Sequence, residues 1–280
     1  MKTIKKVFFS AAIASLAFVS CKEEKIKEEK SAGIVLENMD TSVKPTDDFF
    51  RHVNGTWLDK QGKAPVMPYL AKVDEIKTKK DVETYLTNMA PYGGGGFYGF
   101  GVYNDLKNSS QYAGYMGGGS LGLSRDYYVD AAVKDKLDKY QEFMAKMLQE
   151  FGDDEATAKK NAATIVDFET SLAKPMMTKE ESRDIRKLYN PMSIAELQDL
   201  APAIDWQAHL DGIGVVDLDT IIVTDLGYFK AMSNIFEKRS VEDIKLLLRW
   251  NTINNSLGSL STDLETANWE FYSKEMRGAT

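Results

Sequence analysis

Residues 93–128, GGGGFYGFGVYNDLKNSSQYAGYMGGGSLGLSRDYY, form the segment around which the rest of this chain is built. Two short aromatic-rich runs, 97–102 and 111–116, flank the polar segment 104–110. This order predicts a β-hairpin at about residues 97–117 with a long connecting loop. The glycines also allow the backbone to come close to a second strand, a packed helix or a ligand.

The two glycine clusters, 93–96 and 117–119, raise the question of a phosphate-binding loop. The pattern G-x-x-x-x-G-K-[ST] does not occur in the chain, and no lysine is placed beside either cluster to meet a phosphate. We therefore interpret both clusters as parts of a hairpin set among helices, and not as a nucleotide site.

The composition is that of an ordinary globular protein. The chain has 280 residues, of which 43% are hydrophobic and 28% are charged, and its net charge is -7. This length is sufficient for a substantial core in one or two domains. The negative charge, with lysines scattered among acids, excludes nucleic acid as the main partner because phosphate binding needs a basic face.

The first 20 residues have the pattern of a secretory signal. Three lysines precede an apolar run at 7–19, which ends at Ser20-Cys21. The run is too short for a comfortable transmembrane span. Cys21 is the only cysteine, so the chain can form no intramolecular disulfide.

Cys21 stands where a bacterial lipoprotein carries its lipidated cysteine, although residues 18–20 fit the usual lipobox loosely. We expect lipidation of Cys21, and hence an exported envelope protein held to the membrane by a lipid anchor at the outer membrane or cell surface. An ordinary signal peptide followed by a chance cysteine is the alternative. The charged residues 21–37 then form a flexible tether.

Beyond the hairpin, apolar residues recur at helical spacing and predict a mainly α fold. The expected helices cover 79–90, 130–151, 153–174, 179–188, 193–200 and 240–276. The β-branched run 219–224, DTIIVT, predicts a short strand. The apolar stripe at 240–276 is longer than its local partners, so we expect the chain alone to pack loosely and to expose apolar surface.

A further helix is predicted after residues 45–48, PTDD, because Thr46 can cap it and the two acids suit its N-terminus. Gly55 marks a position of close packing or an early end. One helix face is expected to be buried, and its apolar members are Phe49 or Phe50, Val53 and Trp57.

Residues 38–58, NMDTSVKPTDDFFRHVNGTWL, resemble the opening of the neprilysin and endothelin-converting-enzyme family of zinc metallopeptidases, with its pattern "MD...P.DDF...VNG.W". Further motifs follow in the family's order: FGVYNDLKNSS from Phe100, LGLSRDYYVD from Leu121, LYNPMS from Leu188, LRW from Leu248 and ETANWEFY from Glu265. The resemblance implies that residues 38–280 form the helical N-terminal domain of such a peptidase.

This resemblance also implies that full-length relatives use zinc to cleave peptides in a chamber that this domain encloses. The sequence departs from the family in two places. After Lys60 it lacks a long segment, which in the family includes an arginine that contacts the substrate carboxylate, and it ends before the catalytic half with its H-E-x-x-H helix. We therefore expect no catalytic residue and no bound zinc in this chain, which would be inactive alone.

The residues themselves lead to the same expectation about zinc. A catalytic zinc site needs three protein ligands, usually with two on one helix face. His52 and His209 are the only histidines and lie far apart in the sequence, so we expect both at the surface. The carboxylate pairs 153–154 and 180–181 stand at helix starts or exposed positions, and no G-x-S-x-G elbow occurs.

Two functions from different classes remain open. In the first, the chain is the N-terminal part of a neprilysin-like metalloendopeptidase and limits substrates to peptides. In the second, it is a free-standing, non-catalytic surface lipoprotein that binds peptides or a protein partner. A downstream coding continuation with H-E-x-x-H would favour the first.

Overall fold

The computed structural model describes residues 35–93 and 96–279, and helices dominate this part of the chain, which confirms the predicted mainly α class. The helices are α1 (Phe49–Gln61), α2 (Met67–Asp74), α3 (Lys79–Met89), α4 (Arg125–Val129), α5 (Lys134–Glu150), α6 (Glu155–Ala173), α7 (Ile185–Leu188), α8 (Ile194–Leu200), α9 (Trp206–Gly212), α10 (Leu226–Lys238), α11 (Val241–Ser256) and α12 (Thr262–Trp269). The strands are β1 (Tyr98–Asn104), β2 (Tyr112–Gly118), β3 (Asn190–Met192) and β4 (Ile221–Val223).

The predicted hairpin is confirmed, and it belongs to a four-stranded sheet in the order β1-β2-β4-β3. β1 and β2 pair antiparallel, with Tyr98 opposite Gly118. β2 then pairs parallel with β4, where Gly114 lies opposite Ile221. β4 is the strand predicted from the β-branched run, whereas β3 is too short to show a period in the sequence.

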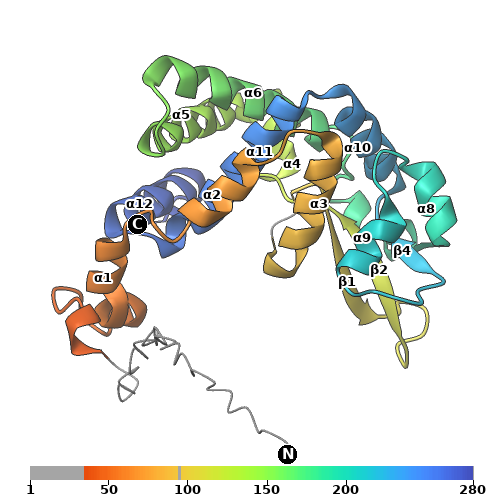
Figure 1. Ribbon diagram of the computed structural model, residues 1–280, viewed down its shortest axis with the longest axis horizontal. Coiled ribbons are helices and arrows are strands. Elements are labelled where there is room, and N and C mark those ends of the chain that lie inside the picture. The colour runs from red at the N-terminus through yellow and green to blue at the C-terminus, as the bar shows by residue number, and fades with distance from the viewer. Residues whose placement is uncertain (1–34, 94–95, 280) are drawn as a thin grey trace, which may run out of the picture.

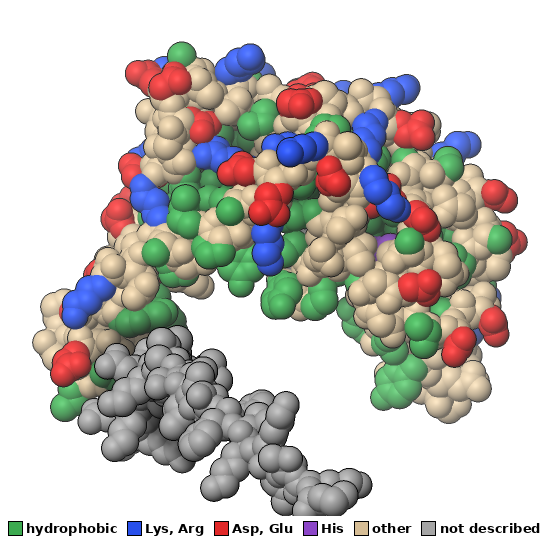
Figure 2. Space-filling view, in the orientation of Figure 1, with side chains coloured by type: hydrophobic (Ala, Val, Ile, Leu, Met, Phe, Trp, Pro, Cys, Tyr) green, Lys and Arg blue, Asp and Glu red, His purple; other side chains and the backbone are tan. Residues whose placement is uncertain are grey.

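The elements form an arch (Figure 1). α1 and α12 lie at one end, α5, α6 and α11 span the middle, and the sheet with α8 and α9 lies at the other end. The space-filling view shows a hollow on the lower side of this arch, where apolar side chains gather (Figure 2).

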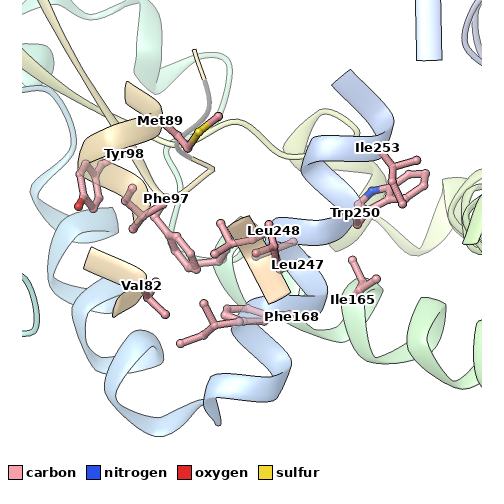
Figure 3. Close-up of a cluster of buried hydrophobic side chains, with 14 of the residues drawn as sticks. Val82, Met89, Phe97, Tyr98, Ile165, Phe168, Leu247, Leu248, Trp250 and Ile253 are labelled. Atoms are coloured by element: carbon pink, nitrogen blue, oxygen red, sulfur yellow. The ribbon is translucent and has the colours of Figure 1, made fainter. Parts of the chain in front are cut away.

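The middle of the arch is packed where α3, α6 and α11 meet the start of β1 (Figure 3). Phe97 lies between Phe168 of α6 and Phe236 of α10, with 5.8 Å between ring centroids in both pairs. All three rings are buried. Burial of aromatic rings in tilted or edge-on pairs stabilises the fold through both area and ring geometry.

Helix starts follow the capping chemistry of the sequence. Ser193 accepts a hydrogen bond from the backbone of Glu196, whose carboxylate accepts one in return, so α8 begins at the predicted capping box. Asp154 accepts from the backbone N–H of Thr157 and starts α6.

The predicted burial of one face of α1 is wrong. Phe49, Phe50 and Trp57 are 65%, 55% and 42% exposed, whereas Arg51 is only 4% exposed. Helical spacing shows which side chains share a face but does not show whether another element covers that face. The expectation of close packing at Gly55 is confirmed, because an added Cβ would lie 2.7 Å from Cβ of Asp40.

The predicted single helix at 240–276 is also wrong, because the segment breaks at 257–261. α11 ends at Ser256, a short 3-10 turn follows, and α12 begins at Thr262, after which 270–275 widens into a π-helical turn. The break redirects the chain so that Phe271 stacks on Phe143 of α5 at a centroid distance of 4.3 Å. The charged segment 179–188 likewise forms only short turns and α7.

Among the helices that the structure describes, none is both long enough and apolar enough for a membrane crossing. The predicted signal (1–20), Cys21 and all but the last three residues of the predicted tether (21–37) lie outside the described residues.

Candidate functional site

A pocket of about 390 Å³ lies between α2, α3, the loop after β2 and α11. Residues 120–122 of the loop after β2 form one wall of the pocket. Its longer polar side chains are tyrosines and asparagines, namely Tyr69, Tyr85, Tyr92, Asn251, Asn254 and Asn255, and its apolar side chains are Met89, Leu121 and Leu248. None of the described lining residues is charged, although 28% of the chain is. The pocket therefore offers neutral hydrogen-bonding groups beside aromatic rings, a combination typical of ligand sites.

Some polar groups of this pocket form hydrogen bonds within the protein, and others do not. The side-chain oxygen Oδ1 of Asn254 accepts a hydrogen bond from Tyr272 Oη at 2.9 Å. Thr252 Oγ1 donates to the carbonyl of Leu248 at 2.8 Å and lies 3.2 Å from Tyr85 Oη. Within the described part of the chain, the side-chain amides of Asn251 and Asn255 make no hydrogen bond. They remain available to a ligand, as do the side-chain nitrogen of Asn254 and the hydroxyls of Tyr69, Tyr92 and Ser120, for which the described residues also give no hydrogen bond.

Behind the loop of the pocket lies Glu169 of α6, which is completely buried. Its carboxylate accepts hydrogen bonds from the backbone N–H of Gly122 at 3.1 Å, from Tyr128 Oη at 3.0 Å and from Tyr140 Oη at 3.3 Å. Burial raises the pKa of this carboxyl to about 7, and the three donors oppose that rise only partly. The protonation of Glu169 therefore changes near neutral pH.

This carboxylate connects two walls of the pocket. Trp250 of α11 donates from Nε1 to Tyr140 Oη at 2.7 Å, so a chain of hydrogen bonds runs from α11 through Tyr140 to Glu169 and on to Gly122. A Cβ at Gly122 would lie 1.7 Å from Tyr140 Oη. Only glycine therefore allows the loop to approach Tyr140 so closely.

The two histidines do not form a metal site. His52 lies in α1 and His209 in α9, at opposite ends of the arch (Figure 1). His52 is half-buried, with Nδ1 2.7 Å from the carbonyl oxygen of Val43. The described residues contain no group of three His, Cys, Asp or Glu side chains that could hold a metal ion. The side chains described in this chain thus do not fit a zinc ion.

The expectation of a surface position for His209 is wrong. The ring is buried against Tyr98, with 4.9 Å between the centroids, and Nδ1 lies 2.9 Å from Thr87 Oγ1. Burial lowers the pKa of His209 to about 4, so the ring is neutral at neutral pH. His209 shares a face of α9 with Trp206, and this neighbour brings it into the core.

The carboxylate pairs have the structural roles that the sequence indicates. Asp153 forms a salt bridge with Arg249 at 3.1 Å, and Asp154 caps α6. Glu181 accepts from the backbone N–H of Thr178 at 3.0 Å. No acid/base couple arises from them.

The sequence did not predict that two charged residues, Glu169 and Arg51, are buried. A signal exists for Glu169, because Ile165, Glu169 and Leu172 follow one another at spacings of four and three on the apolar stripe of α6. Arg51 carries no comparable signal, since charged residues beside apolar ones are ordinary on an exposed helix.

Comparison with known proteins decides the family of this chain. The sequence profile of the N-terminal domain of Peptidase family M13 matches residues 58–280. The chain belongs to peptidase family M13. This result confirms the resemblance found in the sequence.

Curated M13 relatives are longer than this chain. Neprilysin-11 of Caenorhabditis elegans is 26% identical over 245 residues, which cover 78% of this chain and 29% of that protein. Endothelin-converting enzyme 1 of Rattus norvegicus is 30% identical over 182 residues, which cover 62% of this chain and 24% of that enzyme. The chain thus spans about a quarter to a third of the relatives it matches.

A solved M13 structure has the same arrangement of elements. The zinc metalloprotease Zmp1 of Mycobacterium tuberculosis, in its open state, matches with a TM-score of 0.76 and 26% identity. The match covers 81% of this chain and 36% of Zmp1. M13 proteins include zinc metalloproteases, and the chain corresponds to their N-terminal domain.

Proposed function

We propose that this chain acts as the wall of the substrate chamber in an M13 zinc metalloendopeptidase and limits the substrates of that enzyme to peptides. Membership of the M13 N-terminal family over residues 58–280 carries the proposal. The hollow side of the arch and the neutral pocket of about 390 Å³ supply a surface of the required kind (Figure 2).

In such a peptidase, zinc activates the water that attacks the peptide bond. The described residues of this chain do not fit zinc, so no chemical step is assigned to them. Their part is to exclude bulk water and bulky proteins and to hold the substrate, which favours reaction through orientation.

A chimaera tests the proposal. Residues 38–280 replace the matching N-terminal part of Zmp1, and cleavage of a short quenched peptide is compared with cleavage of casein. We expect chelator-sensitive cleavage of the peptide and little cleavage of casein, while the 280-residue chain alone cleaves neither. Equal cleavage of casein and peptide, or chelator-sensitive cleavage by the chain alone, would overturn the proposal.

We also propose that Cys21 carries a lipid and anchors the exported protein in the cell envelope. The signal-like run 7–19 and the single cysteine at its end support this assignment. Metabolic labelling with a fatty-acid probe should mark the wild-type protein and leave Cys21→Ser unlabelled. Equal labelling of both proteins would contradict lipidation at this residue.

A further inference from the structure

We propose that the pocket beside α11 binds an uncharged, extended stretch of the substrate peptide through the main chain of that peptide, with Asn251 and Asn255 as the pairing residues. This inference rests on the proposed function, because it assigns part of the substrate to one site in the chamber wall.

The neutrality of the pocket is the first observation. No described lining residue carries a charge, so a charged substrate side chain would lose hydration there without gaining a partner. An uncharged stretch of peptide loses little hydration free energy when it enters the pocket. Tyr69, Tyr85 and Tyr92 add aromatic surface, and aromatic rings contribute much of the contact energy at binding sites.

The two available amides are the second observation. A carboxamide presents one acceptor and two donors, so it can pair with both the C=O and the N–H of a peptide unit. The side-chain oxygen of Asn254 and the hydroxyl of Thr252 already have partners in the protein. Asn251 and Asn255 are therefore the lining residues whose whole carboxamide, acceptor and donors alike, has no hydrogen bond within the described part of the chain.

The spacing of these two residues matches an extended peptide. They stand four residues apart on α11, which corresponds to about 6 Å along the helix axis and to the same helix face. In an extended chain, alternate residues repeat at about 6.6 Å and present their main-chain groups in the same direction. Asn251 and Asn255 can thus pair with alternate residues of one strand.

Two walls of the pocket are also held in place before any ligand binds. Glu169 fixes the backbone of Gly122 in one wall, and the bond from Trp250 to Tyr140 fixes α11 in the other. Binding to a preformed site avoids the entropy cost of ordering it.

The test uses the full 280-residue chain and the blocked hexapeptide acetyl-Ser-Leu-Ser-Leu-Ser-Leu-amide at millimolar concentration, followed by NMR titration. Asn251→Asp and Asn255→Asp keep the side-chain shape but remove the amide donors. Each should weaken binding about tenfold, as should N-methylation of the peptide at its serines. The matched control is Asn234→Asp on the exposed face of α10, where the amide donates only to the carbonyl of Lys230 at 2.9 Å. It makes the same change in charge and should leave binding unaltered.

The outcomes separate this inference from the proposed function. Absence of hexapeptide binding, equal binding by the N-methylated peptide, or unchanged binding by both aspartate variants would overturn the inference. So would binding of maltohexaose at the same residues, which would assign the pocket to a sugar. None of these results affects the casein comparison with the chimaera, on which the proposed function stands separately. Unchanged thermal melts of the variants exclude loss of folding as the cause of weaker binding.

Discussion

Two buried charges lie in different parts of the arch, Arg51 of α1 at one end and Glu169 of α6 in the middle. The guanidinium of Arg51 meets the carboxylates of Glu265 and Asp59, and it donates to the carbonyl of Leu260 at 2.9 Å. Glu169 meets only hydroxyl and backbone N–H donors, and the described residues give it no salt bridge.

The difference shows how each region is held. At Arg51, the opposite charges of Glu265 and Asp59 compensate the free-energy cost of burying the guanidinium. The ion pair with Glu265 also joins α1 to α12. At Glu169, burial is compensated by neutral donors, so the free energy of the site depends on whether the carboxyl is protonated. One end of the arch is thus stabilised by an ion pair, whereas its middle contains a carboxyl group whose protonation changes with pH.

Among the substitutions that test this comparison, controls aside, removal of the Arg51 charge should have the largest effect. Arg51→Met leaves Glu265 and Asp59 without their cation, at a cost of about 3 kcal/mol, the lower part of the range for broken buried pairs because both carboxylates keep some access to water. Hydrogen exchange should show faster opening of α1.

The control for this prediction is Arg186→Met, because Arg186 is exposed and pairs with Asp184 at the surface. It should cost less than about 0.5 kcal/mol. Equal effects of the two substitutions would mean that burial of the Arg51 pair contributes nothing to docking of α1.

The pH dependence of stability should show the next effect, through Glu169. Its folded pKa of about 7 lies above the usual 4.5, so the folded state binds the proton more tightly. The contribution of Glu169 to the free energy of unfolding is greatest below pH 4.5. It falls as the pH rises from 4.5 to about 7 and does not change further above pH 7. Relative to Glu169→Gln, the free energy of unfolding should fall by at most about 3 kcal/mol across this window.

Urea titrations at several pH values measure this difference. Glu242→Gln, at an exposed position of α11, is the matched control and should give a curve parallel to the wild type. A constant difference between wild type and Glu169→Gln from pH 4.5 to 7 would show that Glu169 does not titrate there.

A smaller effect is expected for Tyr128→Phe, which removes one donor to Glu169 and one acceptor for the backbone N–H of Leu123. The loss should be about 1 to 2 kcal/mol and greater at pH 8 than at pH 5, because the hydroxyl stabilises the ionised carboxylate most. Since this donor opposes the raised pKa, the stability transition of Glu169 should also move to higher pH. A loss that is the same at both pH values would contradict this account.

The smallest effect is expected at the exposed face of α1. Phe49→Ser should change the free energy of unfolding by less than about 0.5 kcal/mol, because this side chain is mostly in water. Leu58→Ala, at a buried position of the same helix, should cost about 2 to 5 kcal/mol. Binding of a hydrophobic dye should decrease in Phe49→Ser if this face contributes to the exposed apolar surface. A large loss of stability in Phe49→Ser would show that another element covers the face.

Local features of this fold could be predicted well from the sequence. The capping box at Ser193 and Glu196 and the β-branched run at 219–224 each determine local structure through contacts a few residues apart. The hairpin follows similarly from aromatic runs on both sides of a polar turn.

Features that depend on distant partners could not be predicted. The partners of Arg51 stand more than 200 residues away at Leu260, Thr262 and Glu265, except for Asp59. The pocket at Asn251 forms only when α2, α3 and the 120–122 loop meet α11. Periodicity shows neither arrangement, because it describes one element at a time.

The parallel pairing of β2 with β4 has a consequence for how this protein emerges from the ribosome. Gly114 and its partner Ile221 are 107 residues apart, so β2 stays without its neighbour for roughly 5–20 s of synthesis at ordinary translation rates. Throughout that interval the finished hairpin presents an open, aromatic strand edge to any chain nearby. Self-association during biogenesis is thus a greater hazard at β2 than at any helix of the arch, and a holding chaperone would be needed most before β4 is made.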